Sequence, residues 1–393
     1  MQYRRFGRTE LQMPVFSCGG MRYQHKWKDI PPADIPKENQ QNLEKTIHRA
    51  IAVGINHIET ARGYGSSEMQ LGWVLPQFER DKLIVQTKVS PKPDAQEFRQ
   101  EFEKSLAFLK LDYVDLLGLH GINNEEILHN SLKPGGCLAE AKKLQAEGKV
   151  RFIGFSTHAP TEIIIKAIES DQFDYVNLHW YYINQFNWPA IEAAINHDMG
   201  VFIISPSDKG GKLYQPSQKL VELCQPLSPM VFNDLFCLSY PQVHTLSIGA
   251  AKPFDFEEHL KALPLLDKAN KILPPIIERL EEAAIAILGK DWFETWHLGL
   301  PTPEKTPGGI NIPVILWLRN LALAYDMMDY AKMRYNLLGN ANHWFPGEKA
   351  NKVTKFDLRS CLRNSPHRHK IPEILLECDR LLGGQEVKRL SQS

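Results

Sequence analysis

The sequence predicts an α/β protein in which a closed (β/α)8 barrel, a TIM barrel, is followed by a mainly helical C-terminal extension. Three observations support this fold class. Eight short runs rich in β-branched and aromatic residues recur along the chain, segments with helical spacing separate them, and this rhythm stops near residue 262. Strands that alternate with helices form βαβ units and a parallel sheet. Eight such units over about 250 residues are typical of a closed barrel.

The eight apolar runs are the predicted barrel strands. Their length and composition fit strands that are buried on both faces, as a parallel barrel requires. In chain order they occupy residues 14–20, 54–60, 82–89, 113–120, 150–158, 175–182, 200–207 and 244–250. No G-x-G-x-x-G motif follows the first run, so the sequence does not predict the dinucleotide site of a doubly wound sheet.

Between these runs, apolar residues return at every third or fourth position, which is the spacing of a helix with one buried face. Leu43, Ile47 and Ile51 are an example. Segments of the same kind follow the third, fourth and fifth runs, at residues 97–109, 138–149 and 161–170. These segments are the predicted outer helices of the barrel.

Beyond the barrel, the sequence predicts a packed helical region. Two long segments with helical patterns, residues 274–296 and 311–338, lie on either side of a proline-rich connector at 298–313. We therefore expect two domains, a barrel over residues 1–262 and a helical region over residues 263–393.

Charge and composition restrict the function classes. The 46 basic and 46 acidic residues cancel, so the overall charge favours neither nucleic acid nor an anionic membrane as a partner. The longest apolar segment, residues 310–325, is interrupted by Arg319 and Asn320, and it is too short to span a bilayer. The N-terminus lacks the apolar core of a signal peptide, and the six cysteines are scattered without paired spacing. We expect free thiols and a cytoplasmic location.

The predicted strand ends carry the polar residues that could form an active site, because active sites of these barrels lie where strands end and βα loops begin. Glu59, Lys88 and His120 lie at three successive strand ends, and Tyr64 follows Glu59 in a glycine-flanked turn. Burying Lys88 alone would be costly, so it needs a carboxylate partner, and Glu59 on the neighbouring strand is the candidate. His158 and His179 also follow strands, but neither has a second ligand at helical spacing, so no metal site is predicted.

These four residues could move a proton. A tyrosine has a pKa near 10, but an ammonium about 4 Å away, at an effective dielectric constant of about 20, contributes roughly 4 kcal/mol, or about three pKa units. Lys88 is therefore expected to make Tyr64 a readier proton donor, with Glu59 anchoring the lysine and His120 orienting a substrate oxygen. Such a pocket suits a carbonyl that gains a hydride. The alternative for Lys88 and Glu59 is a purely structural ion pair, and the presence of Tyr64 and His120 at the right strand ends argues against it.

Several stretches, in the right order along residues 1–262, resemble the aldo-keto reductases. They are "YRRFGRTELQMPVFSCGGM", "HIETARGYGSSEMQLG", "VQTKV", "LLGLHG", "GKVRFIGFSTH" and "LSIGAAKPFDFEEHL". The resemblance implies an oxidoreductase that reduces a small aldehyde or ketone with NADPH, or alternatively NADH. It assigns the catalytic roles to Tyr64, Lys88, Glu59 and His120. The family's aspartate is Glu59 here, which keeps the charge on a longer side chain.

The same resemblance implies which residues bind the cofactor. Ser156, Thr157 and Asn177 correspond to the nicotinamide end, Ser205, Ser207, Gly210 and Leu213 to the loop around the pyrophosphate, and Gly249 and Lys252 to the adenosine phosphate. His259 replaces the asparagine that usually closes the adenosine segment. NADPH is the expected cofactor because Lys252 can pair with a 2′-phosphate.

The C-terminal stretch "TKFDLRSCLRNSPHRHKIPEILLECDRLL" resembles the end of a subgroup of aldo-keto reductase-like proteins that carry a ferredoxin-type module. Aligned on Cys361, the other three cysteine positions of that module hold Lys355, Leu358 and Ser365. Because a cubane cluster needs four thiolates, no iron-sulfur cluster is expected in this degenerate segment, at about residues 350–385. A different class of function, a nicotinamide-binding regulatory or scaffold protein with little turnover, stays open as the alternative.

Overall fold

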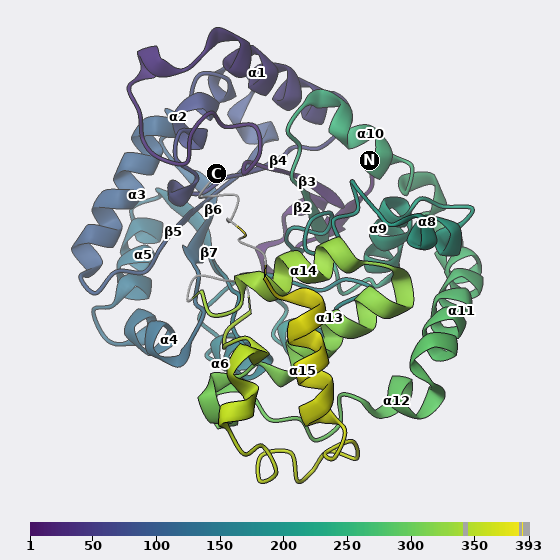
Figure 1. Ribbon diagram of the computed structural model, residues 1–393. Helices are drawn as coiled ribbons and strands as arrows, with labels where there is room; N and C mark the ends of the chain where they lie inside the picture. Colours follow the sequence, from purple (N-terminus) through teal and green to yellow (C-terminus); the bar gives the residue numbers. More distant parts are fainter. Residues whose placement is uncertain (341–344, 385–386, 388–393) are drawn as a thin grey trace. The chain divides into compact units, whose positions relative to one another are not determined.

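A closed barrel of parallel strands forms the centre of the first part of the chain (Figure 1). The computed structural model describes residues 1–340, 345–384 and 387. The barrel strands close in the order β10-β3-β4-β5-β6-β7-β8-β9, which confirms the predicted fold class. Their bounds are β3 (Phe16–Gly19), β4 (His57–Glu59), β5 (Ile84–Val89), β6 (Val114–His120), β7 (Val150–Ser156), β8 (Tyr175–Leu178), β9 (Gly200–Ile203) and β10 (Thr245–Ile248).

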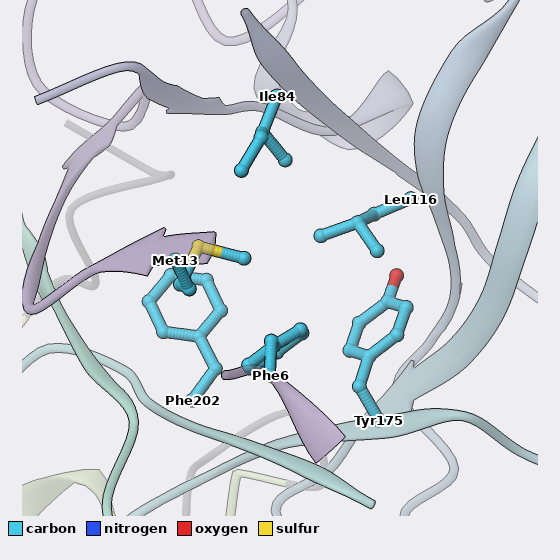
Figure 2. Close-up of a cluster of buried hydrophobic side chains, with 6 residues drawn as sticks. All are labelled: Phe6, Met13, Ile84, Leu116, Tyr175 and Phe202. Atoms are coloured by element: carbon cyan, nitrogen blue, oxygen red, sulfur yellow. The ribbon is translucent and has the colours of Figure 1, made fainter. Parts of the chain in front are cut away.

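One end of the barrel is filled by apolar side chains. The hairpin of β1 (Tyr3–Arg5) and β2 (Gln12–Pro14) precedes the first barrel strand. It brings the buried side chains of Phe6 and Met13 to this end. Figure 2 shows the resulting cluster, which consists of Phe6, Met13, Ile84, Leu116, Tyr175 and Phe202. Because Ile84 and Tyr175 are the first residues of β5 and β8, this is the end at which the strands begin. The polar strand ends therefore lie at the opposite end.

Helices surround the strands on the outside (Figure 1). Helix α1 buries Leu43 and Ile47. Asp94 caps the N-terminus of α3, because its carboxylate accepts a hydrogen bond from the backbone N–H of Gln96. The helices are α1 (Lys37–Ala52), α2 (Ser67–Leu71), α3 (Ala95–Leu109), α4 (Glu125–Leu132), α5 (Cys137–Ala146), α6 (Thr161–Glu169), α7 (Trp188–Asn196), α9 (Pro229–Ser239) and α10 (Phe256–Leu260). Each helical pattern identified between the barrel strands forms a helix.

The chain divides into two compact units, and the second contains the predicted helical extension. The barrel unit comprises residues 1–210 and 230–269, and the second unit comprises residues 211–229 and 270–393. The helices of the second unit are α8 (Gln218–Cys224), α11 (Ala269–Leu288), α12 (Lys290–Thr295), α13 (Ile312–Tyr325), α14 (Met328–Leu337) and α15 (Ile371–Leu382). Helix α13 is buried on nearly every side and forms the core of this unit.

Hydrogen bonds attach residues 211–229 to the other helices of the second unit. The Ser217 hydroxyl donates to the backbone carbonyl of Tyr325 at 2.6 Å, and the Arg279 guanidinium donates to the carbonyl of Leu223. All six cysteines carry free thiols, as expected. None of the helices in the described part of the chain combines the length and apolar character needed to cross a membrane.

Candidate active site

The polar residues at the ends of β4, β5 and β6 come together at the end of the barrel opposite the apolar cluster. Glu59 is the last residue of β4, and His120 is the last residue of β6. Lys88 lies one residue before the end of β5, beside Gly118 of β6 in the strand register. Tyr64 ends a short 3-10 turn, η3 (Arg62–Tyr64), that follows β4. Parallel strands therefore bring together residues that are far apart in the sequence.

Lys88 is a buried cation held by two oxygen atoms. Its side chain is 2% exposed, its ammonium forms an ion pair with Glu59, and it donates to the backbone carbonyl of Thr60 at 2.8 Å. The ion pair expected from the sequence is thus present. Gly118 leaves room for the lysine stem, because a Cβ atom at that position would lie 2.9 Å from Lys88 Cγ. The charge is compensated where it is buried, as a buried cation requires.

Tyr64 lies against this cation. Lys88 Nζ is 5.0 Å from the centroid of the Tyr64 ring, which is within the range of a cation–π contact. The Tyr64 ring also meets the His120 ring edge to face, with centroids 5.8 Å apart and an interplanar angle of 84°. The structure therefore brings the four predicted residues into one cluster, with the hydrogen bonds of the ammonium directed to Glu59 and Thr60.

The protonation states differ from the expectation at one residue. Burial raises the pKa of the Tyr64 hydroxyl above its usual value, where the sequence predicted that Lys88 would lower it. The physical reason is that desolvation of the phenolate outweighs the attraction of an ammonium whose charge Glu59 already balances. Burial also lowers the pKa of Lys88. Burial, together with the nearby charge of Lys88, lowers the pKa of His120 to about 3, so this imidazole is neutral at physiological pH.

Two residues on the next strands could hold an amide group. Ser156 ends β7 and pairs in the strand register with Asn177 of β8. The Ser156 hydroxyl oxygen accepts the backbone N–H of Gly121 at 3.1 Å. Asn177 is fully buried, and among the described residues its side-chain amide has no hydrogen-bond partner at either atom. An unpaired buried amide is costly, and the carboxamide of a nicotinamide would satisfy it.

Thr157 has a different environment. Its hydroxyl donates to the carbonyl of Ile122 at 2.6 Å and accepts the backbone N–H of Ala159 at 2.9 Å. Both functions of the hydroxyl are used within the turn that follows β7. The predicted cofactor contact of Thr157 stays a prediction.

The loop after β9 contains the residues predicted to surround a pyrophosphate. Ser205 has a positive φ of 55°, and its carbonyl accepts the N–H of Lys209 at 2.9 Å, which closes a tight turn. Gly210 is required by the same turn, because a Cβ atom there would lie 2.1 Å from the carbonyl oxygen of Pro206. Leu213 belongs to the second unit and is buried.

His259 contacts this loop through Ser207. Its Nδ1 atom is 2.5 Å from a carboxylate oxygen of buried Asp234, and its Nε2 atom is 3.4 Å from the Ser207 hydroxyl. The Asp234 carboxylate accepts a hydrogen bond from Nδ1–H, which leaves Nε2 to face Ser207. His259 was recognisable in the sequence as a substitution, but no motif revealed Asp234, which reaches it from α9.

The segment after β10 combines basic and acidic residues. Lys252 is exposed and precedes the turn η6 (Pro253–Asp255), where Asp255 accepts the backbone N–H groups of Ala251 and Lys252. Arg22, from the loop after β3, lies beside Gly249: a Cβ atom on Gly249 would be 3.2 Å from Arg22 Cδ. Arg22 is a second basic residue at this segment, and no motif in the sequence revealed it.

Trp27 is a further residue that sequence reasoning missed, and its ring meets the Tyr64 ring edge to face with centroids 6.0 Å apart. Its loop lies directly on Gly65, which has a φ of 56°. A Cβ atom on Gly65 would be 2.2 Å from the Lys26 carbonyl oxygen and 2.4 Å from the Lys28 nitrogen. The glycine after Tyr64 was a visible signal of close approach, but the sequence did not show which backbone approaches it.

His158 and His179 form a hydrogen-bonded pair. The Nδ1 atom of His158 is 2.6 Å from Nε2 of His179, whose Nδ1 atom is 2.6 Å from the Tyr181 hydroxyl. Each histidine is thus hydrogen-bonded, and the sequence did not show that they bond to one another. Within the part of the chain that the structure describes, no three His, Cys, Asp or Glu side chains are grouped so that they could hold a metal ion.

The four positions aligned with cluster cysteines lie in the second unit. Lys355 ends the turn η10 (Ala350–Lys355), while Leu358 and Ser365 are buried. The Cys361 thiol is half-buried and donates to the carbonyl of Leu358 at 3.2 Å. Helix α15 follows this segment.

Comparisons with known proteins find a family model that matches most of the barrel. Residues 16–210 match the model of the Aldo/keto reductase family. L-galactose dehydrogenase of Arabidopsis thaliana is 33% identical over 136 residues, which are 32% of this chain and 40% of that protein, so the match spans less than half of that relative. The uncharacterized oxidoreductase YqkF of Bacillus subtilis is 23% identical over 252 residues, or 55% of this chain and 80% of that protein.

A solved structure shows the same fold. The aldo-keto reductase from Klebsiella pneumoniae in complex with NADPH has a TM-score of 0.55 and 19% identity, over 70% of this chain and 95% of that chain. At this identity, the similarity supports the barrel fold and does not assign an activity.

Proposed function

Residues 16–210 belong to the aldo/keto reductase family, and from this premise we propose that the chain is an oxidoreductase that reduces an aldehyde or ketone with NADPH. Tyr64 is the proton donor. The single observation that carries the proposal is the cluster of Tyr64, Lys88, Glu59 and His120 where the barrel strands end. Each residue has a separate task in the reaction.

Tyr64 holds the proton that the product needs. Burial raises the pKa of its hydroxyl, so the group is protonated at neutral pH and can donate to the alkoxide, a stronger base than phenolate, that forms as the carbonyl is reduced. Lys88, beside the ring, stabilises the phenolate left behind. Glu59 holds Lys88 in position, and the neutral His120 can donate an N–H to the carbonyl oxygen and orient it. The bound cofactor supplies the hydride.

The polar residues at the ends of the barrel strands, and in the loops that follow them, support a dinucleotide cofactor. Ser156 and the unpaired amide of Asn177 suit a nicotinamide carboxamide. The turn that contains Ser205, Ser207 and Gly210 is proposed to follow the pyrophosphate. Lys252 and the neighbouring Arg22 favour a cofactor with a 2′-phosphate, which is NADPH, and NADH is the alternative.

Lys252→Ala tests the cofactor preference. We expect the Kd for NADPH to rise about tenfold or more, which corresponds to the loss of one charge-assisted contact, while the Kd for NADH stays the same. Fluorescence titration with each nucleotide measures both constants. An equal weakening for both nucleotides would exclude a contact of Lys252 with the 2′-phosphate.

Rapid mixing of NADPH-loaded protein with an activated aldehyde tests the reaction. We expect oxidation of NADPH by the native chain and no measurable oxidation by Tyr64→Phe, with nearly unchanged NADPH affinity, because the substitution removes only the donated proton. A native chain that binds NADPH tightly but does not oxidise it would support the rival function, a nicotinamide-binding regulatory or scaffold protein. The presence of Glu59 at the position of the family's aspartate is the observation that keeps this rival in view.

The small carbonyl compound is the only partner in this proposal, and the proposed location is the cytoplasm, where free thiols such as the six in this chain persist. For the C-terminal region, we propose a degenerate ferredoxin-type segment without its cluster, at about residues 350–385. Cys361 is the only cysteine at the four aligned positions, and one thiolate cannot hold a cubane. Stoichiometric iron and acid-labile sulfide in anaerobically purified protein would contradict this.

A further inference from the structure

Glu68 is a fully buried carboxylate close to the proposed site. It lies on α2, and its side chain is 0% exposed. A glutamate is almost never buried to this extent unless it is paired. One of its oxygen atoms accepts the Thr87 hydroxyl at 2.6 Å, and the other forms an ion pair with Arg62. The carboxylate therefore bridges two elements.

These two elements carry the residues that must meet in the proposed reaction. Arg62 is the first residue of η3, the turn that ends with Tyr64. Thr87 directly precedes Lys88 on β5. Because side chains alternate across a strand, Thr87 points away from the barrel interior when Lys88 points into it. Glu68 thus holds β5 from the outside at the place where Lys88 projects inward.

Arg62 extends the same connection to the loop over Tyr64. Its guanidinium also forms an ion pair with Asp29, two residues after Trp27, and it lies 3.4 Å from Glu101 and 4.9 Å from the centroid of the Phe108 ring. The turn η3 has no side-chain cap of its own. Arg62 and its buried partner Glu68 are consequently polar anchors of the turn that presents Tyr64.

We propose that Glu68 is a positioning residue, which fixes Tyr64 relative to Lys88 by bonding to Arg62 on one side and to Thr87 on the other. The inference rests on the proposed function for its catalytic meaning. Loss of either bond would loosen the turn relative to the strand, and a displacement of about 1 Å at a reacting group lowers a rate on the order of a hundredfold.

Steady-state kinetics test the effect on the reaction. We expect Glu68→Gln to lower kcat between about tenfold and a hundredfold with little change in KM or in NADPH affinity. Thr87→Val, which removes one hydrogen bond and keeps the shape, should lower kcat less. Glu101→Gln is the matched control, because it changes a 39% exposed partner of the same guanidinium, and it should behave like the native chain. A loss in Glu101→Gln equal to that in Glu68→Gln, or an effect on KM alone, would overturn the proposal.

A spectroscopic measurement makes the test independent of turnover. In protein labelled with ¹³C at the tyrosine Cζ atoms, the Tyr64 signal is identified by its absence in Tyr64→Phe. We expect this signal to shift or broaden in Thr87→Val and Glu68→Gln and to stay in place in Glu101→Gln. An unmoved signal in both bridge variants overturns the positioning role even if the native chain is an active reductase. A moved signal in a chain that reduces no carbonyl keeps the positioning role and refutes the proposed function.

Discussion

At the scale of single residues, the pair of Lys88 and Glu59 determines the electrostatics of the barrel interior. Two opposite charges are buried together, and the ammonium faces the Tyr64 ring. Breaking such a pair leaves one charge uncompensated, which typically costs about 3–5 kcal/mol. The carboxylate is therefore needed for the stability of the barrel as well as for the position of Lys88.

Two variants at position 59 distinguish the effect of the side chain's charge from the effect of its length. Glu59→Asp keeps the charge and restores the family's residue, so we expect kcat to stay the same or rise. Glu59→Gln removes the charge and should lower the free energy of unfolding by about 3 kcal/mol or more. Steady-state kinetics and urea denaturation measure the two effects. A folded Glu59→Asp variant with no activity would show that the inferred geometry of the cluster is wrong.

His57 gives a pH dependence that does not involve the reaction. It is fully buried, its Nδ1 atom bonds to Ser17 at 2.6 Å, and burial, with a smaller contribution from Lys88, lowers its pKa to about 3. Its unfolded-state pKa is about 6.5. The folded state therefore keeps His57 neutral, and the stability it contributes is complete above about pH 6.5 and is lost as the pH falls towards 3.

The variant His57→Gln measures this contribution. Between about pH 7 and about pH 5, the native chain should lose about 2 kcal/mol more of its free energy of unfolding than the variant, because only the native chain must exclude this proton. Urea denaturation at the two pH values provides the comparison. His120, with a pKa also lowered to about 3, contributes the same slope in both proteins and so cancels. Equal slopes in the two proteins would contradict the neutral, buried state of His57.

At the scale of elements, the turn η3 and the loop at residues 26–28 are held together by backbone contacts. Ser66 donates its backbone N–H to the carbonyl of Lys26 at 3.0 Å, and Gly65 lets the backbones touch. Gly65 has both a positive φ and no free space for a Cβ atom, so two independent requirements select glycine there.

Gly65→Ala is expected to displace this loop. The new Cβ atom would overlap the backbone at Lys26 and Lys28, so we expect altered Trp27 fluorescence and a fall in kcat/KM of about tenfold or more. Gly63→Ala is the matched control in the same turn, because the nearest atoms to its new Cβ atom, on the His120 ring, are 3.9 Å away. Emission spectra and steady-state rates compare the variants. A normal rate in Gly65→Ala would mean that the loop does not affect the site.

The elements also show which parts of the site the sequence could predict. Glu59, Lys88 and His120 were identifiable because strand periodicity and the direction of parallel strands fix where their side chains meet. Trp27, Arg22 and the bridge of Glu68 could not be found in this way. Their positions depend on a loop and a short helix whose contacts follow from close packing and not from any period in the sequence.

At the scale of the whole molecule, the barrel and the helical region were both predictable, since alternating strands and helices stop where the long helical patterns begin. The assignment of residues 211–229 to the second unit was not predictable from the sequence. Helix α8 has an ordinary amphipathic composition, and its bonds to Tyr325 and Arg279 show that it packs in the second unit. Such contacts join residues more than 50 positions apart and leave no local signal.

The path of the chain through its two units has an evolutionary consequence. An accessory domain acquired by gene fusion is joined to its host at one point and can be lost by a single truncation. Here the polypeptide enters the second unit at residue 211, returns to the barrel at residue 230 and leaves again at residue 270. A stop codon near residue 270 would remove most of the second unit. The shortened chain would still contain α8, without the helices that α8 packs against. Each unit is therefore encoded by two separate segments of the gene, and exchanging one continuous segment cannot replace one whole unit and leave the other unchanged.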